Sequence, residues 1–233
     1  MSTESATVRD LRRLWKPHKL RLNGVQSDHP TAVRFHRACS WLAEAEKMDP
    51  NDQSDLVLIQ QWVAFNALYG QWDEVAHEPA PDRSRWMTFL KEIKDLDEEQ
   101  RLPQLLLAER DLVIEILGNS YLNRSYWRAE CPEQQQKFAR AKFEAQSWYF
   151  EKRYLVILEQ VLERVYLLRC QIMHGAATCG SQLNRDALAI CTRILRLFMP
   201  IVLQVWIDHG SDRDWGALCY PPLSAPERLV RPR

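Results

Sequence analysis

Glycine and strand-like patterns are scarce in this chain. Only 7 of its 233 residues are glycine, and it contains no glycine-rich phosphate loop and no alternation of predicted strands with helices. Apolar residues instead recur at helical spacing almost throughout, and a hydrophobic content of 46% is ordinary for a globular chain. The sequence therefore predicts an all-α fold in one medium-sized domain.

Neither an excess of charge nor a long apolar run is present. The 31 basic residues equal the 31 acidic ones, which argues against a protein that coats nucleic acid through its overall field, so any RNA contact must be local. No run of about eighteen apolar residues occurs, and the first residues lack the apolar segment of a secretion signal. We expect no membrane span and a cytoplasmic location.

The six cysteines form no CxxC pair and no regular disulfide framework. Reduced thiols are therefore favoured. Cys170, His174 and Cys179 are conceivable zinc ligands, but no fourth ligand is evident and the spacing matches no common structural zinc site. We expect neither a metal nor another cofactor.

An arginine stands among apolar residues near the predicted end of a long helix. Arg169 falls on the apolar face that includes Val165 and Ile172, where an unpaired charge would be costly. Gly175 is a typical helix stop, and a last turn that unwinds there would swing His174 back beside the guanidinium. The pair would suit phosphate anchoring and proton transfer. The structural alternative is an interhelical ion pair for Arg169 and a favourable helix-end position for His174.

A second segment combines an apolar helix face with one amide. Leu58, Trp62, Phe65 and Tyr69 form a continuous apolar face, and Asn66 follows Phe65. Asn66 would either fix the pairing of two helices or hold Arg169 or His174 from a facing helix. The sequence leaves both roles open.

These two segments carry a resemblance to a known family. Residues 167–175, with Arg169 and His174, resemble the Arg-x4-His signature of the HEPN superfamily, although Cys170 occupies a position that is commonly Asn, Asp or His. Residues 62–70 are similar to the second helix of a HEPN subgroup related to toxin and defence ribonucleases. With their flanking helices the segments span about residues 30–209. The resemblance implies a HEPN-like antiparallel helical bundle with additional helices, dimeric, with Arg169 and His174 lining a cleft between subunits.

The activity that this resemblance implies is metal-independent cleavage of RNA. A ribose 2′-hydroxyl would attack the adjacent phosphate and leave a 2′,3′-cyclic phosphate, with His174 transferring a proton and Arg169 stabilising the phosphoryl charge. Asn66, Cys170 and Gln171 would support these two residues. Such a protein would act as a toxin or antiviral effector, and its partners would be RNA, a second copy of itself and an antitoxin or sensor protein. The alternative is a noncatalytic HEPN module that binds a nucleotide, a nucleic acid or a partner protein.

The remaining segments complete the expected organisation. Residues 1–29 are a basic N-terminal arm, which either contacts RNA flexibly or packs Trp15 on the bundle, and residues 210–233 are a proline-containing tail of doubtful fixed structure. The aromatic and cationic residues of 121–147 either bind single-stranded RNA or cover a small satellite core. Asn184 can cap the last helix. Helices are predicted at about 31–48, 84–93, 102–117, 147–174 and 184–209, and a further one begins near Asp52 or Ser54 and runs to Tyr69.

Overall fold

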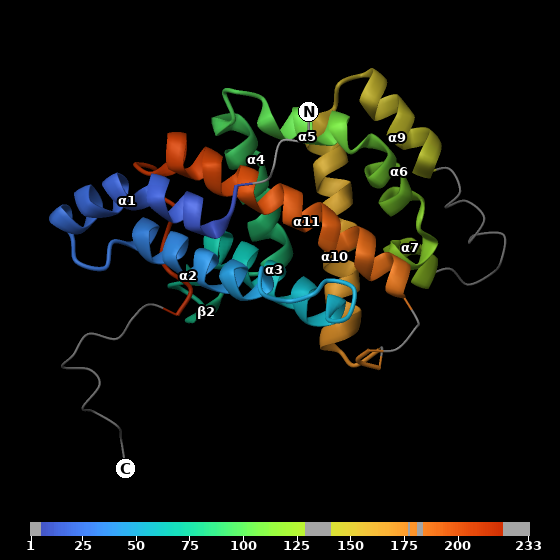
Figure 1. The fold of residues 1–233 in the computed structure, drawn as a ribbon, viewed down its shortest axis with the longest axis horizontal. Coiled ribbons are helices and arrows are strands. Elements are labelled where there is room, and N and C mark those ends of the chain that lie inside the picture. Colours follow the sequence, from blue (N-terminus) through green and yellow to red (C-terminus); the bar gives the residue numbers. More distant parts are fainter. Residues whose placement is uncertain (1–5, 129–140, 177, 181–183, 221–233) are drawn as a thin grey trace, which may run out of the picture.

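The computed structural model describes residues 6–128, 141–176, 178–180 and 184–220, and these form an all-α fold, as predicted (Figure 1). Within them, strand structure is confined to a small antiparallel hairpin, β1 (Trp72–Asp73) and β2 (Glu78–Pro79). The α-helices are α1 (Val8–Val25), α2 (Pro30–Ala45), α3 (Ser54–Tyr69), α4 (Asp82–Leu96), α5 (Arg101–Ala108), α6 (Arg110–Gly118), α7 (Arg124–Trp127), α9 (Ala141–Phe150), α10 (Tyr154–Met173) and α11 (Arg185–Val205). A 3₁₀ turn, η1 (Ser120–Leu122), precedes α7, and a π-helical turn, η3 (Trp206–Gly210), extends α11.

Helix α3 lies at the centre of the fold, where it contacts α2, α4, α10 and α11. Phe65 in its middle is fully buried and meets the rings of Trp62, Phe89 and Phe198 with centroids 5.5–5.8 Å apart. Such edge-on aromatic contacts add to the hydrophobic gain of burial. The predicted end of this helix at Tyr69 is confirmed, and of its two expected starts, Asp52 and Ser54, the structure has Ser54.

The N-terminal segment belongs to this core. Thr7 caps α1 in a capping box with Asp10, and the buried ring of Trp15 stacks on Phe35 with centroids 4.4 Å apart. The cations of this helix lie on its exposed side, where Arg12 bonds to the Cys39 carbonyl and Arg21 pairs with Asp212. They are Arg9, Arg12, Arg13, Lys16, Lys19 and Arg21. The interpretation of this segment as a flexible arm is therefore wrong for residues 8–25, because the apolar side of an amphipathic helix outweighs its charges, and the packing alternative for Trp15 is confirmed.

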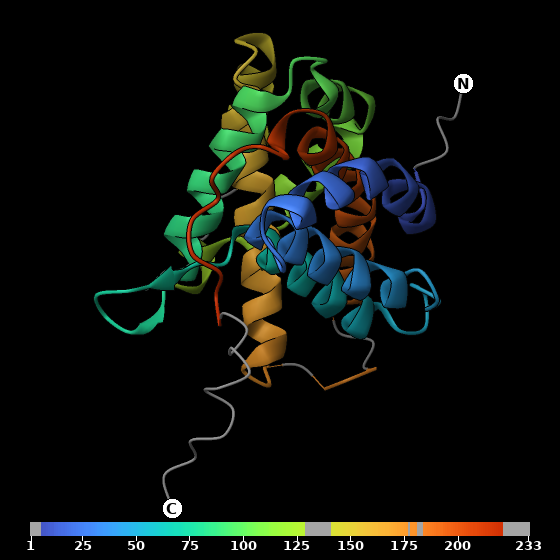
Figure 2. The same ribbon diagram turned by 90° about the vertical axis from the view of Figure 1, so that its left-hand side faces the viewer.

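Residues 211–220 are also fixed on the core, which corrects the expectation of a loose tail for this part of the chain. Trp215 stacks on Trp206 with centroids 4.3 Å apart and donates a hydrogen bond to the Gly210 carbonyl. Leu218 forms a bridge with Gln71 next to the hairpin. Figure 2 shows this segment running beside α4 towards the hairpin, which projects from the helices. Residues 221–233 lie outside the described residues.

Three other predicted features differ from the structure. The helix expected over 147–174 is broken between α9 and α10, where Lys152 adopts a left-handed conformation with φ of 55°. The helix expected over 102–117 is two helices that meet at Glu109. Asn184 does precede α11, but its side chain makes no capping hydrogen bond, because its backbone is left-handed with φ of 64°.

The segment 121–147 is only partly covered, since residues 129–140 are outside the described ranges. Tyr121, Tyr126 and Trp127 contact one another edge-on or at a tilt, with centroids 5.3–6.2 Å apart. Tyr121 and Trp127 remain more than half exposed. These rings therefore form a small surface cluster.

Helix α11 and its π-helical extension are long and apolar enough to cross a membrane by length and composition. Within its most apolar window, however, 56% is buried inside the protein, as in the core helix of a globular fold.

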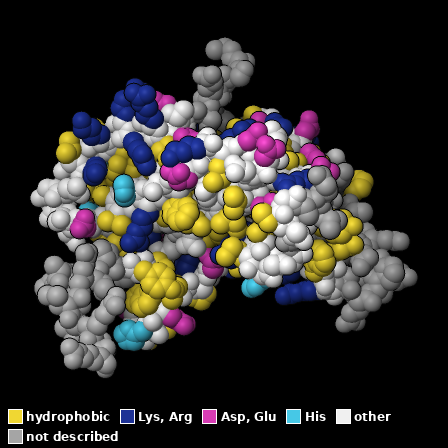
Figure 3. Space-filling view, turned by 60° about the horizontal axis from the view of Figure 1, so that its bottom comes forward, with side chains coloured by type: hydrophobic (Ala, Val, Ile, Leu, Met, Phe, Trp, Pro, Cys, Tyr) yellow, Lys and Arg dark blue, Asp and Glu magenta, His cyan; other side chains and the backbone are white. Residues whose placement is uncertain are grey.

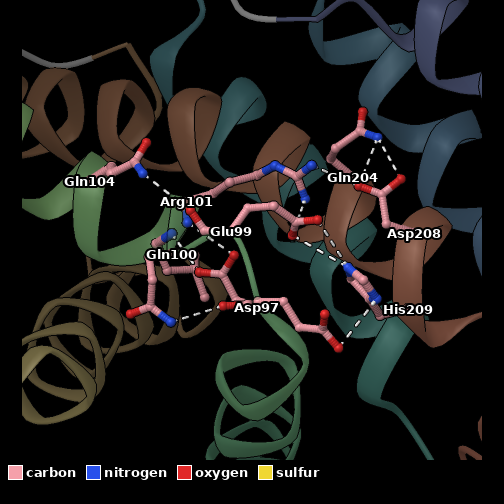
Figure 4. A network of polar contacts seen from close by, with 10 residues as sticks. Asp97, Glu99, Gln100, Arg101, Gln104, Gln204, Asp208 and His209 are labelled. Atoms are coloured by element: carbon pink, nitrogen blue, oxygen red, sulfur yellow. Dashed lines mark hydrogen bonds and ion pairs between the residues drawn. The ribbon is translucent and has the colours of Figure 1, made fainter.

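The end of the π-helical extension is fixed by polar contacts from the turn between α4 and α5 (Figure 4). Arg101 pairs with Asp208 at 2.8 Å, and His209 lies 3.1 Å from the Glu99 carboxylate.

Candidate functional site

Helix α10 ends where the sequence predicts. The helix ends at Met173, His174 follows it, and Gly175 takes the left-handed conformation with φ of 69°. The Ala176 amide donates to the Gln171 carbonyl at 2.9 Å and the Gly175 amide donates to the Ile172 carbonyl at 3.0 Å. This is a Schellman ending, in which a glycine conformation closes the helix. The prediction that His174 lies just beyond the last regular turn is confirmed.

His174 is exposed, and the structure does not bring it beside Arg169. Across the described residues, its imidazole forms no hydrogen bond or ion pair, and it does not line the cavity that contains Arg169. The Schellman turn reverses the backbone only after His174, so it does not fold the imidazole back along the helix. The expectation that both side chains meet within one chain is wrong.

Arg169 has the anionic partner that a half-buried guanidinium requires. Its side chain is 25% exposed, and its Nη1 lies 4.0 Å from Asp82 Oδ2 at the start of α4. The guanidinium also lies 5.9 Å from the ring centroid of Tyr166, one turn earlier on α10. Asp82 accepts a second contact, a 2.5 Å hydrogen bond from the hydroxyl of Tyr69. Arg169 is therefore positioned by Asp82 of α4, which Tyr69 of α3 holds in turn, and by Tyr166 of its own helix.

The two tyrosines beside Arg169 are held in their neutral form. Burial raises the pKa of Tyr69 well above its ordinary value, and the charge and hydrogen bond of Asp82 act in the same direction. Burial, with Cys170 nearby, raises the pKa of Tyr166 to about 12. Both hydroxyls are therefore hydrogen-bond donors at neutral pH.

Arg169 lines a cavity of about 560 Å³, which is within the usual size range of ligand pockets. Asn66 lines the same cavity, so the structure brings these two predicted site residues together. The full lining comprises Arg34, Arg37, Trp41, Val63, Asn66, Ala67, Tyr69, Gly70, Gln71, Pro79, Ala80, Asp82, Arg85, Tyr166, Arg169, Leu218, Cys219 and Tyr220.

Asn66 shapes the cavity wall through the chain turn that follows it. Its carbonyl accepts a 2.7 Å hydrogen bond from the Gly70 amide, and a Cβ at position 70 would lie only 2.7 Å from Asn66 Oδ1. In the described part of the chain, the Asn66 side chain forms no hydrogen bond with Arg169 or His174. Gly70 is therefore required by the close approach of its backbone to this amide.

Of the two residues after Arg169, Cys170 contacts the guanidinium, whereas Gln171 bonds to another element. Gln171 donates to the Tyr121 carbonyl at 3.2 Å and so connects α10 to η1. The thiol of Cys170 lies 4.0 Å from Arg169 Nη1, and neither Cys170 nor Gln171 lines the cavity. Among the described residues, no three His, Cys, Asp or Glu side chains are grouped closely enough to hold a metal ion.

Sequence reasoning missed Arg34, Arg37, Arg85 and Asp82. A signal existed for Arg34, which precedes Ala38 by four residues and so falls on the buried face of α2. The positions of Arg85 and Asp82 follow from how α4 packs on α10, which no local pattern encodes.

Comparisons of the chain with family models, with curated proteins and with solved structures found no match.

Proposed function

We propose that this protein is a metal-independent RNA endonuclease of the HEPN type. The observation that supports it best is the end of α10, which presents a fixed guanidinium and, five residues later, a solvent-accessible imidazole. A planar, permanently charged fork binds two phosphate oxygens at once, and an imidazole exchanges protons near neutral pH. The likeness of both sequence segments to HEPN signatures adds to this support.

The reaction requires one base and one acid. The base removes the proton of a ribose 2′-hydroxyl, whose oxygen then bonds to the adjacent phosphorus. The bond from phosphorus to the 5′-oxygen breaks, and the acid protonates that oxygen, so the products are a 2′,3′-cyclic phosphate and a 5′-hydroxyl. Arg169 would stabilise the charge on the phosphoryl oxygens, and Asp82 would orient Arg169.

A two-fold dimer would supply both proton-transfer groups. Because His174 and Arg169 do not meet within one chain, each imidazole would act in a cleft shared with a second copy, one as base and the other as acid. Met173, next to His174, leaves 57% of its surface exposed. Figure 3 brings this side of the molecule forward and shows groups of hydrophobic side chains with Lys and Arg side chains between them. Such a mixed surface suits contact with another protein.

The biological role that accompanies this activity is that of a cytoplasmic toxin or antiviral effector, restrained by an antitoxin or a sensor protein. This part of the proposal is supported by the sequence resemblance of residues 62–70 and 167–175 to defence ribonucleases.

The decisive experiment incubates the purified protein with a broad panel of RNAs in EDTA and analyses the product ends. We expect cyclic-phosphate ends from the wild type and a loss of at least about a hundredfold for His174→Ala. Arg169→Lys should also fail substantially, because an ammonium keeps the charge but loses the two-pronged contact. His36→Ala, which removes another exposed imidazole, should cut as the wild type does. Intact RNA with the wild type, or equal cutting by His174→Ala, would refute the nuclease proposal.

One observation favours a second candidate, a noncatalytic module that binds RNA, a nucleotide or a partner protein. Arg169 is already paired with Asp82, and His174 does not line the cavity. Binding of RNA without any cleavage, in the same experiment, would favour this candidate.

A further inference from the structure

The cavity next to Arg169 is lined by four arginines but only one carboxylate. Arg34 and Arg37 come from α2, Arg85 comes from α4 and Arg169 comes from α10, whereas Asp82 is the single acidic residue in the lining. Asp82 pairs with Arg169. In the described chain, the other three guanidinium groups therefore have no carboxylate partner.

Arg34 is almost fully buried; its two terminal nitrogens donate to neutral groups, whereas its Nε is buried without a partner. It is 1% exposed and donates to the carbonyls of Leu68, Gly70 and Ala217, among others. Burial lowers its pKa to about 10, and the positive charges of Arg37 and Arg85 act in the same direction. Arg34 remains charged at neutral pH, so it adds a positive field to the cavity wall.

Arg37 and Arg85 are less completely satisfied. Arg37 donates to the carbonyls of Cys219 and Tyr220, at 3.1 and 3.4 Å. Arg85 is half-buried, and across the described ranges its guanidinium has neither an ion pair nor a hydrogen bond. Its Nε is fully buried without a partner. A buried donor left unpaired in this way costs free energy until a ligand accepts from it.

A purely structural role explains Arg34 and most of Arg37, since both hold the carbonyls of residues 215–220. It does not explain Arg85, whose guanidinium bonds to no described residue. Closely packed like charges, with the Nε donors of Arg34 and Arg85 unpaired, raise the energy of the empty cavity. A bound anion would offset the repulsion and could accept from the guanidinium of Arg85.

We propose that this cavity is a phosphate-binding site, with Arg85 as the principal ligand of the phosphate and Arg37 and Arg169 beside it. The expected ligand is a phosphate monoester, because two negative charges match the excess of guanidinium groups and their forked donors. The rings of Trp41 and Tyr166 also line the cavity and suit an attached nucleobase. This site goes beyond the proposed cleavage, since it needs no proton transfer and does not involve His174.

The experiment titrates the protein by calorimetry at low salt with inorganic phosphate, adenosine 5′-monophosphate and adenosine. Both phosphate compounds should bind, whereas adenosine should bind at least about tenfold more weakly than its monophosphate. Arg85→Gln should weaken monophosphate binding at least about tenfold. Lys91→Gln removes one exposed positive charge from the same helix and should leave the affinity unchanged. No binding of either phosphate compound at millimolar concentration, or equal affinity in Arg85→Gln, would overturn the proposal.

Thermal stability without ligand separates a binding role from a structural one. Because Arg85 has no partner and repels its neighbours, Arg85→Gln should melt at the same temperature as the wild type or above it. A clear fall in melting temperature for Arg85→Gln but not for Lys91→Gln would show a structural role and overturn the proposal.

The source of the phosphate is distinguished with a short RNA whose 2′-hydroxyls are methylated, so that it cannot be cleaved. Tighter binding of its 5′-phosphorylated form than of adenosine 5′-monophosphate identifies an RNA end, and the reverse order identifies a free nucleotide. Neither measurement depends on nuclease activity, so a failure of the cleavage proposal would leave this one standing.

Discussion

Arg34 connects the beginning and the end of the described chain through one side chain. Its guanidinium donates to the carbonyls of Leu68 and Gly70 at the end of α3 and to the carbonyls of residues 215–217. The latter segment is otherwise held by Trp215 and by the bridge at Leu218. The side chain therefore couples the position of the C-terminal segment to the central helices.

Arg34→Leu should lower the free energy of unfolding by about 3 kcal/mol, because several buried carbonyls lose their donor while the apolar stem is retained. Urea unfolding followed by tryptophan fluorescence measures this loss, and proteolysis within residues 211–220 should become faster than in the wild type. Arg12→Leu is the matched control, since Arg12 is exposed and its contacts with the described residues centre on Cys39, whose carbonyl it donates to. If the two variants lose equal stability, Arg34 does not have this role.

Sequence patterns located some of these residues and not others. Arg169 was identified because it interrupts a helical apolar face, and the same test applied to α2 would have identified Arg34. Arg85 precedes the buried Phe89 by four residues, so the same test would also have placed it near the buried face of α4. Its position in the cavity depends on the packing of α4 against α10, which only the folded chain defines.

At the scale of elements, the turn between α4 and α5 binds the end of α11 through Glu99 and Arg101, and we call these contacts the α4–α5 clamp. Asp97 accepts hydrogen bonds from the amides of Arg101 and Leu102 and so fixes the start of α5 (Figure 4). The neighbouring Glu99 lies 3.1 Å from His209 in η3. The hydrogen bond to His209 is the main reason that the pKa of Glu99 is lowered from 4.5.

Acid should therefore loosen this clamp. Above about pH 4.5 Glu99 is ionised in both the folded and the unfolded chain, so its stabilising effect is complete. As the pH falls below 4.5, the unfolded chain takes up the proton first, and the stabilisation is lost as the pH passes through the lower pKa of the folded state. Urea unfolding of Glu99→Gln should show less dependence on pH in this window than the wild type. Glu115→Gln, at an exposed site, should keep the wild-type dependence; an unchanged dependence in Glu99→Gln would contradict the prediction.

The predicted elements were most accurate where apolar spacing and breakers agree, as in α3 and at the end of α10. They were wrong where a helix is interrupted at a residue whose type does not favour the interrupting backbone conformation. Lys152 is left-handed between α9 and α10, although lysine rarely takes this conformation, and neither glycine nor proline marks the place. The charges of α1 likewise concealed an apolar face of only a few residues.

At the scale of the whole molecule, the proposed chemistry depends on a second copy. We expect a dimer at micromolar concentration, with the end of α10 and the start of α11 at its interface. Light scattering measures this mass directly. Met173→Glu, which places a charge on the exposed end of α10, should shift the protein towards the monomer and reduce RNA cleavage together. A monomeric wild type, or a monomeric Met173→Glu variant with full cleavage activity, would contradict this arrangement.

Residues 218–220 form the part of the four-arginine cavity wall that is synthesised last, and this affects when the cavity can form during protein synthesis. The other walls come from α2, α3, the chain around the hairpin, α4 and α10, all of which leave the ribosome earlier. A nascent chain that has already folded these helices would still lack the residues whose carbonyls hold Arg37. The phosphate site is thus assembled late, and ribosome-bound chains stalled before residue 218 should not retain a phosphate ligand.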